Sequence, residues 1–231
     1  MRFMSFTPSK IITSPQQGIH ANLEQLVSKH LAHAYRKPIA DYNQRAFNSA
    51  RDYWNKLGQP SVILDSACGT AESTRFLSVQ YKHSLIIGLD QSAKRLANSE
   101  NKNLTDNAIL LRCDCTDFWR LAQQAKWVFE KHYLLYPNPY PKPPHLQRRW
   151  HGHPAFPNLL AISQQVELRT NWRLYAEEFA AALRIAGHAV TLNQHHSNIA
   201  ITAFERKYQL SGHDLWCLSC HIHPDAALYG A

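Results

Sequence analysis

Three aspartates each stand at or just after the end of a short, mostly apolar run that predicts a buried strand. The runs are residues 61–64, 84–89 and 107–112, and the aspartates are Asp65, Asp90 and Asp114. Parallel strands bring their carboxyl ends to one edge of a sheet, where α/β proteins bind ligands. Carboxylates accept hydrogen bonds from hydroxyl and amino groups. Together the three predict a nucleoside-binding edge, although each alone is a common cap or turn residue.

The turn after the first run is made of small residues. Ser66, Ala67, Gly69 and Ala71 carry little or no side chain, so a ligand can lie against the main chain. The helix expected from Thr70 onward adds free N–H groups. With one glycine, the turn lacks the G-x-G-x-x-G pattern of dinucleotide sites and better suits a nucleoside that carries an amino-acid tail. An ordinary strand-to-helix turn is the alternative interpretation.

Spacing gives two of the aspartates a more specific role. Asp90 lies about 20 residues beyond the small-residue turn, the position from which a carboxylate accepts hydrogen bonds from a ribose diol. Asp114 follows the third strand, where it can accept from an adenine amino group. We therefore expect the ligand to contain an adenosine.

The composition indicates one globular domain. The chain has 231 residues, of which 45% are hydrophobic, enough for one sizeable core. It contains no run of about 18 apolar residues, and its first residues lack the apolar core of a secretion signal. Five cysteines, an odd number, favour a reducing compartment over a disulfide scaffold. We expect a cytoplasmic protein without a membrane span.

The net charge of +8 favours a polyanionic partner through counterion release, although a basic surface without a specific partner is the alternative. Residues 136–150 contain five prolines, which exclude a regular helix or central strand. The same segment combines cations with aromatic rings, as nucleic-acid surfaces do; a rigid polyproline linker is the other interpretation. Its cations and rings include Tyr140, Lys142, Arg148, Arg149 and Trp150.

The rest of the pattern predicts a flexible arm at residues 1–20 and a single domain at residues 21–231. Helices are expected at residues 22–34, 44–57, 117–124, 156–165 and 171–186. Further strands are expected at residues 127–135, 166–170, 188–192, 199–204 and 214–220.

Several segments, in the order in which they occur along the chain, resemble motifs of the tRNA (guanine-N7) methyltransferase family over roughly residues 55–220. The Pro137–Lys142 segment is similar to the family's Pro-Asp-Pro-Trp motif, and Thr170-Asn171-Trp172 to its Thr-Asp-Trp segment. The other matching segments are Leu64–Thr70, Gly88–Asp90, Asp114, the basic residues His145, Arg148 and Arg149, Tyr175–Glu177, and Thr202–Arg206 with Gly212, His213 and Trp216.

The resemblance implies a class I methyltransferase fold, an α/β Rossmann-like domain with a seven-stranded, mostly parallel sheet in the order 3-2-1-4-5-7-6 and helices on both faces. It implies S-adenosyl-L-methionine as the methyl donor, tRNA as the partner and transfer to N7 of a guanosine during tRNA processing. We expect a monomer or weak homodimer, and no metal site is implied.

The resemblance also assigns the site residues. Asn138 is the expected catalytic residue, at the end of strand four between cofactor and base. The expected cofactor-binding residues are Asp65, Ser66, Gly69, Asp90, Gln91, Asp114, Cys115 and Asn138. The expected contacts to the target nucleotide are Lys142, Asn171, Thr202 and Glu205, and the expected phosphate contacts are Arg148 and Arg149.

Two amides replace family aspartates, at Asn138 and Asn171, and Ala71 stands where a further glycine is expected. Guanine N7 carries a free lone pair, so its methylation needs no general base. An amide keeps a carbonyl acceptor but loses a charge that would stabilise the purine cation, which is worth about 1–2 kcal/mol per bond. Two such losses would slow the reaction on the order of a hundredfold or indicate another substrate.

Three alternatives remain open. Asn138-Pro139-Tyr140 resembles the Asn-Pro-Pro-Tyr motif of amino-methyltransferases, one residue short. A decayed family member that binds cofactor and RNA or a partner would also show lost acids. Finally, Cys217-x-x-Cys220-His221 matches a haem-attachment pattern and offers zinc ligands, although the alternation around it fits a terminal strand.

Overall fold

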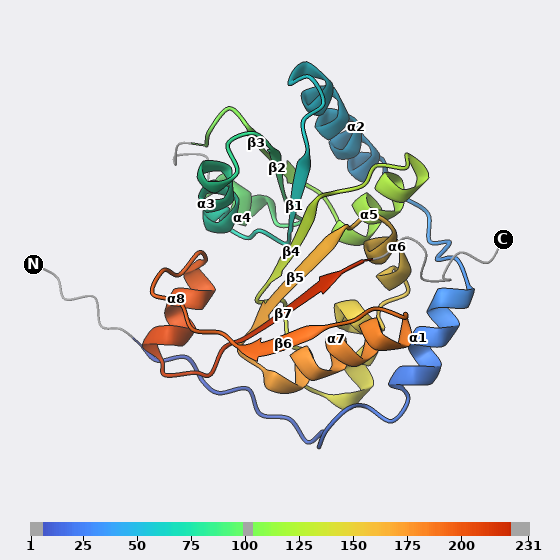
Figure 1. The fold of residues 1–231 in the computed structure, drawn as a ribbon, viewed down its shortest axis with the longest axis vertical. Coiled ribbons are helices and arrows are strands. Elements are labelled where there is room, and N and C mark those ends of the chain that lie inside the picture. The colour runs from blue at the N-terminus through green and yellow to red at the C-terminus, as the bar shows by residue number, and fades with distance from the viewer. Residues whose placement is uncertain (1–6, 99–103, 223–231) are drawn as a thin grey trace, which may run out of the picture.

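The computed structural model describes residues 7–98 and 104–222. Within them, seven strands form one sheet in the order β3-β2-β1-β4-β5-β7-β6 (Figure 1). Neighbouring strands from β3 to β5 run parallel, and β7 is antiparallel to both β5 and β6. The predicted strand order is confirmed. The strands are β1 Val62–Ser66, β2 Leu85–Asp90, β3 Ala108–Arg112, β4 Lys131–Leu135, β5 Gln165–Thr170, β6 Thr191–Gln194 and β7 Trp216–His221.

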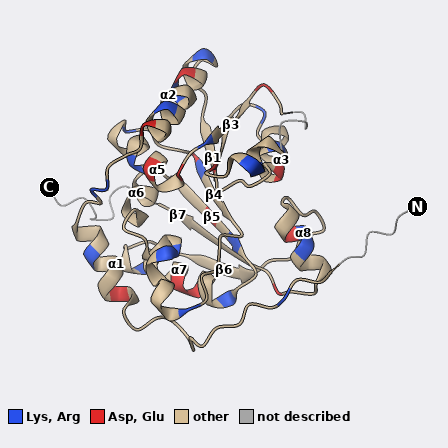
Figure 2. Ribbon diagram, turned by 180° about the vertical axis from the view of Figure 1, so that it is seen from behind, with Lys and Arg blue, Asp and Glu red and all other residues tan. Residues whose placement is uncertain are grey.

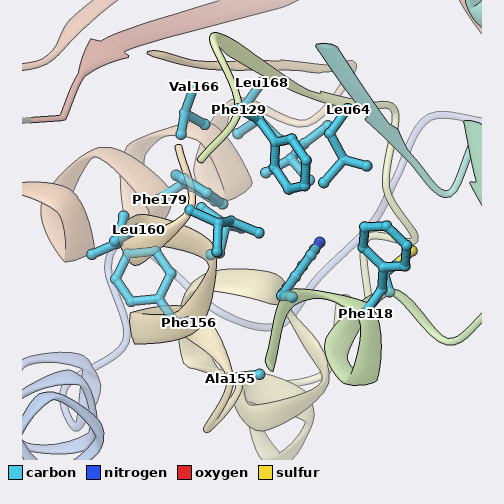
Figure 3. Packing of buried hydrophobic residues seen from close by; sticks show 14 of the residues in the cluster. Leu64, Phe118, Phe129, Ala155, Phe156, Leu160, Val166, Leu168 and Phe179 are labelled. Atoms are coloured by element: carbon cyan, nitrogen blue, oxygen red, sulfur yellow. The ribbon is translucent and has the colours of Figure 1, made fainter. Parts of the chain in front are cut away.

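Helices cover both faces of the sheet. The larger core joins alternate strand residues such as Leu64, Val166 and Leu168 to aromatic side chains such as Phe118 and Phe179 (Figure 3). The smaller core lies on the other face, under α3 and α8. The helices are α1 Leu23–Ala32, α2 Asp41–Lys56, α3 Glu72–Gln80, α4 Ala93–Ala97, α5 Cys115–Gln124, α6 Phe156–Ala161, α7 Arg173–Ile185 and α8 Ala203–Leu210.

The central strands are buried on both faces, as parallel strands covered by helices must be. Gly88 shows how closely α3 approaches β2. A Cβ added at Gly88 would lie 2.6 Å from both Thr74 Oγ1 and Leu110 Cδ2. The sheet therefore requires glycine here so that the start of α3 can reach the end of β1.

Several predicted elements have different bounds. The helix predicted at residues 156–165 ends at Ala161, the strand predicted at 127–135 begins at Lys131, and the strand predicted at 188–192 becomes Thr191–Gln194. The strand predicted at residues 199–204 is wrong, because α8 begins at Ala203.

The cause of the α8 error is a helix cap. Thr202 Oγ1 accepts a hydrogen bond from the Glu205 backbone N–H at 2.9 Å, so the Thr-x-x-Glu sequence starts a helix. The carboxylate of Glu205 accepts from the Ile201 backbone N–H at 3.1 Å. The β-branched residues before the cap had favoured a strand.

The described part of the predicted arm, residues 7–20, contains no helix or strand, yet it is docked on the domain. Ser9 N–H donates to Ser211 Oγ at 2.8 Å, and Ser14 Oγ donates to the Pro141 carbonyl at 2.5 Å. Gln16 Nε2 donates to Glu178 at 2.6 Å. We call residues 7–20 the N-terminal strap, because they tie the end of α8 to residues 136–150, the proline-rich loop.

Across the described part of the chain, no helix combines the length and apolar character needed to cross a membrane.

Candidate active site at the carboxyl edge of the sheet

The end of β1 is fixed by a buried carboxylate. Asp65 Oδ2 accepts hydrogen bonds from Ser73 Oγ and Thr74 Oγ1, both at 2.6 Å. Its other oxygen, Oδ1, is buried, and no donor among the described residues reaches it. Burial raises the pKa of Asp65 to about 6, against the opposing effect of the two hydroxyl hydrogen bonds. Asp65 therefore shapes the small-residue turn through α3 and is not itself exposed at the edge.

The small-residue turn, residues 66–71, curls tightly. Ala67, Gly69 and Ala71 all have φ near +60°, a conformation that costs a non-glycine residue about 1–2 kcal/mol. The Cys68 N–H donates to the Leu89 carbonyl at 2.8 Å, which joins the turn to β2. A Cβ at Gly69 would meet nothing within 4 Å. The main chain of the turn is therefore open at Gly69, as a backbone-bound ligand requires.

Asp90 lies beside that open backbone, at the carboxyl end of β2. Its Oδ2 accepts from the Gly69 N–H at 3.0 Å and from Arg95 Nη1 at 3.2 Å, and its Oδ1 accepts from the Ser92 N–H at 2.8 Å. The carboxylate is 1% exposed, whereas the Arg95 side chain is 53% exposed. A ligand with hydroxyl groups can displace Arg95 from Asp90. Gln91 is exposed next to it.

The predicted cofactor contact of Ser66 is not available to its side chain, because that side chain turns into the core. Trp119 Nε1 donates to Ser66 Oγ at 3.1 Å, and Ser66 Oγ lies 2.8 Å from His132 Nε2. His132 Nδ1 lies 2.9 Å from Ser163 Oγ, which donates to the Leu159 carbonyl. Ser163 must therefore accept from Nδ1–H, and Ser66 donates to Nε2 of a neutral ring. Burial lowers the pKa of His132 to about 3, in agreement with that tautomer.

Asp114 and Cys115 stand where β3 passes into α5. Asp114 Oδ1 caps the helix by accepting from the Thr116 N–H at 2.8 Å and from Thr116 Oγ1 at 2.7 Å. The Cys115 thiol is buried, with a hydrogen bond to the Ala67 backbone, and burial raises its pKa far above the usual value. Cys115 therefore packs α5 against the turn, and the capping role leaves Asp114 Oδ2 for a ligand.

The proline-rich loop, residues 136–150, follows β4 at the same edge. Asn138 is exposed, and no other described side chain or backbone group hydrogen-bonds its amide. Lys142 is exposed, and Arg148 lies over the Tyr140 ring at 5.9 Å. Tyr140 has φ of +45°, which turns the chain sharply after Pro139. The amide and two cations thus face solvent together on one loop.

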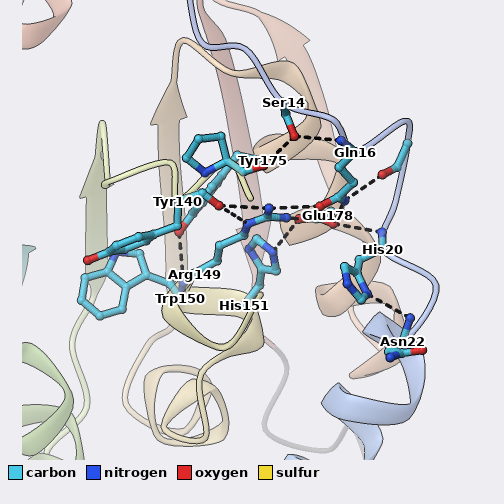
Figure 4. Close-up of polar contacts among 12 residues, drawn as sticks. Ser14, Gln16, His20, Asn22, Tyr140, Arg149, Trp150, His151, Tyr175 and Glu178 are labelled. Carbon is cyan, nitrogen blue, oxygen red and sulfur yellow. Dashed lines mark hydrogen bonds and ion pairs between the residues drawn. The ribbon is translucent and has the colours of Figure 1, made fainter. Parts of the chain in front are cut away.

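Arg149 does not belong with those cations, and its predicted phosphate contact is wrong. It is 0% exposed and forms an ion pair with Glu178, which also accepts from His151 Nε2 (Figure 4). Its guanidinium donates to the Tyr140 carbonyl and to Gln16 Oε1. Burial would raise the pKa of Glu178, but the His151 hydrogen bond and the Arg149 charge outweigh it and hold that pKa at about 2. Arg149 anchors the loop.

Asn171 lies at the end of β5 and pairs with a histidine. Its Nδ2 lies 3.1 Å from His213 Nδ1, and His213 Nε2 lies 3.0 Å from the Ser9 carbonyl. The carbonyl can only accept, so Nε2 carries the proton and the neutral ring accepts from the Asn171 amide at Nδ1. The Asn171 Oδ1 therefore points away from His213.

The predicted contacts of Thr202 and Glu205 with the target nucleotide are wrong as well. Thr202 caps α8, and Glu205 is 0% exposed. Glu205 accepts from His195 Nε2 at 2.8 Å and pairs with Arg169 Nη1 at 3.2 Å. Burial acts to raise the pKa of Glu205, but the His195 hydrogen bond and the Arg169 charge lower it overall. Neither residue is free to bind a nucleotide.

Charge is not gathered on one element. Lys and Arg occur on α1, α2, α7 and α8 together with Asp and Glu (Figure 2). In the described ranges, no group of three His, Cys, Asp or Glu side chains is placed to hold a metal ion. Cys217 and Cys220 lie three residues apart in β7, so they point to opposite faces of the sheet.

Comparison with known proteins agrees with this geometry. Residues 59–218 match a family described as "Putative methyltransferase". A search of curated proteins gave no significant match. The 16S rRNA methyltransferase KamB has a TM-score of 0.55 at 15% identity, covering 81% of this chain and 96% of that chain. A variant 16S rRNA (adenine(1408)-N(1))-methyltransferase from Catenulisporales acidiphilia, solved with its cosubstrate SAM, has a TM-score of 0.54 at 15% identity, covering 75% and 92%.

A third structure, an antibiotic-related methyltransferase, has a TM-score of 0.52 at 13% identity, covering 81% of this chain and 97% of that chain. At such identities the likeness concerns the fold, and the predicted class I, Rossmann-like α/β fold is confirmed.

The first prediction compares two adjacent arginines. Arg149→Met leaves Glu178 buried without its cation and should lower the free energy of unfolding by about 3–5 kcal/mol. Arg148→Met removes an exposed cation and should change it by less than about 0.5 kcal/mol. Urea unfolding of both variants measures this difference. Equal losses would contradict the assignment of Arg149 as the buried anchor.

The second prediction concerns Asp65. Its pKa of about 6 lies above the value of 3.8 for a free carboxyl, so folding takes up a proton between these pH values. Stability from Asp65 is greatest at low pH and is lost as pH rises toward 6 and above. Relative to Asp65→Asn, wild type should lose about 2 kcal/mol between pH 4 and pH 7. A pH-independent difference in urea unfolding would refute the raised pKa.

Proposed function

Because the chain belongs to the tRNA (guanine-N7) methyltransferase family, a family of S-adenosylmethionine-dependent enzymes, we propose that it methylates N7 of a guanosine in tRNA. The observation that carries the proposal is the position of the Asp90 carboxylate against the open backbone of Gly69. It supplies an acceptor and a close-approach surface side by side at the carboxyl ends of β1 and β2.

Each part of S-adenosylmethionine, the methyl donor, has candidate partners among the residues at this edge. Asp90 accepts from the ribose diol once Arg95 moves aside, and Asp114 Oδ2 accepts from the adenine amino group. The turn around Gly69 lies against the methionine portion, on a backbone that Asp65 holds from below. S-adenosylmethionine supplies an electrophilic methyl group on a sulfonium. Ser66 and Cys115 contribute through the core and not by direct contact.

The target side fits methylation of a ring nitrogen. Residues 136–150 contain no Asp or Glu, so the proline-rich loop offers no carboxylate base. Guanine N7 requires none, because its lone pair attacks the methyl group directly. The unpaired Asn138 amide is available to orient the base through its carbonyl oxygen. Lys142 and Arg148 lie exposed on the same loop and supply positive charge for RNA phosphates.

RNA as the substrate class has separate support. KamB and the Catenulisporales enzyme are rRNA methyltransferases of the same fold, and the net charge of this chain is +8. The choice of tRNA over rRNA, and of N7 over another position, rests on the motif resemblance. The amino-methyltransferase and decayed-enzyme alternatives remain outcomes of the test.

The third prediction is methyl transfer from labelled S-adenosylmethionine to bulk tRNA, with 7-methylguanosine as the product in nucleoside analysis. Asn138→Asp restores the family carboxylate and should raise kcat by about tenfold, because a charge-assisted bond is worth about 1–2 kcal/mol more than a neutral one. Asn55→Asp, an exposed amide at the end of α2, is the matched control and should change nothing.

Other products would separate the alternatives. Methylation of an exocyclic amino group would replace the N7 assignment with the amino-methyltransferase reaction. In a parallel reaction with 16S rRNA, 1-methyladenosine formed there and not on tRNA would move the substrate to the ribosome. Cofactor binding without transfer by either wild type or Asn138→Asp would indicate a decayed enzyme.

The fourth prediction concerns cofactor affinity. Asp90→Ala removes the ribose acceptor and the anchor of the Gly69 N–H, so calorimetry should give at least a tenfold weaker dissociation constant for S-adenosylmethionine. Arg95→Ala removes a competitor for the same oxygen and should leave affinity unchanged or improved. Wild-type affinity in Asp90→Ala would exclude Asp90 from the cofactor site.

A further inference from the structure

Three rings stand in a row on α8 and the turn after it. Phe204 and Tyr208 lie one helical turn apart and stack with centroids 6.1 Å apart and planes 25° apart. Tyr208 stacks in turn on His213, at 5.3 Å and 18°. At the inner end of the row, His213 accepts from the Asn171 amide. The row therefore extends from the end of β5 outward.

The outer end of the row is open. The Phe204 side chain is 51% exposed, with one face toward Tyr208. Thr202 and Glu205, its neighbours in the capping sequence, are both buried. A single exposed phenylalanine is ordinary, but this one continues an ordered stack. Its free face has the flat apolar surface on which another aromatic ring can lie.

The row lies next to the proline-rich loop and next to the start of α3. Tyr136, two residues before Asn138, packs on Tyr208 with centroids 5.6 Å apart. Arg206 on α8 pairs with Glu72 at 2.9 Å, and Glu72 is the first residue of α3, directly after the small-residue turn. A molecule that places one base near Asn138 would carry its neighbouring base toward Phe204.

Two cations lie on the same helix as the open ring. Lys207 is exposed next along α8, and the Arg206 side chain is 53% exposed. Positive charge on the helix that carries a stacking ring matches a nucleic acid, whose bases stack while its phosphates contact the cations.

We propose that Phe204 is a stacking platform for an unpaired base of the RNA substrate, beside the target nucleotide. The proposal rests on the proposed function, because it requires an RNA substrate at this edge. Stacking uses the face that every base presents, so the platform would hold the strand without reading its sequence. Specificity for the target would then come from the residues around Asn138.

The test uses the full chain and labelled bulk tRNA. Phe204→Ala and Phe204→Leu should each weaken tRNA binding by about 5- to 100-fold, because both remove a ring that stacks on one base. Phe204→Trp should bind as wild type, and tRNA should quench its added fluorescence. The matched controls are Leu210→Ala and Leu210→Trp, since Leu210 is 64% exposed on the same helix; these should show neither effect.

The outcomes separate the two proposals. If wild type methylates tRNA while Phe204→Ala binds tRNA as wild type does, the platform is wrong and the proposed function stands. If Phe204→Leu binds as tightly as wild type, apolar contact replaces stacking and the platform is likewise wrong. If wild type neither binds nor methylates any RNA, both proposals fail. Unchanged affinity for S-adenosylmethionine in every variant shows that the cofactor side is intact.

Discussion

The buried ion pair between Arg149 and Glu178 holds together the part of the molecule around the proline-rich loop. Glu178 lies on α7, Arg149 ends the proline-rich loop, and both bond to the N-terminal strap through Gln16. Three segments far apart in sequence thus meet at one carboxylate. Within the loop, Pro143–Arg148 form a 3-10 helix with its own backbone hydrogen bonds, and Arg149 at the end of that helix anchors it to α7 and the strap. Arg149 also donates to the Tyr140 carbonyl, which fixes the bend that leaves Asn138 exposed.

The small-residue turn at the end of β1 is held differently, by a set of hydrogen bonds inside the core. Asp65 ties the end of β1 to α3, and the chain from Trp119 through Ser66 and His132 to Ser163 ties it to the opposite face of the sheet. These bonds satisfy buried polar groups that would otherwise cost about 1–3 kcal/mol each. They hold a turn with three residues at positive φ, which leaves the Gly69 backbone open.

Local patterns predicted the sheet edge well, and distant contacts explain the failures. The three acid-terminated strands and the small-residue turn are continuous in sequence, so the strand-end positions of Asp65, Asp90 and Asp114 were predictable. Arg148 and Arg149 are chemically identical neighbours; only a glutamate 29 residues away decides which one is buried. The strand predicted at 199–204 failed because β-branched residues outweighed a cap signal. Likewise, the docked strap depends on partners such as Ser211, 202 residues from Ser9.

The two amides that replace family aspartates, Asn138 and Asn171, are not equivalent. His213 gives its Nε2 proton to the Ser9 carbonyl, so its Nδ1 needs a donor, which the Asn171 amide supplies. A carboxylate at position 171 could pair there only with a doubly protonated ring. Asn171 thus fits the neutral His213 that begins the aromatic row, and its replacement is explained within the fold. No such partner exists among the described residues for Asn138. Under the proposed function, the reason for an amide at position 138 lies in the ligand, and position 138 is the more direct indicator of which base is methylated.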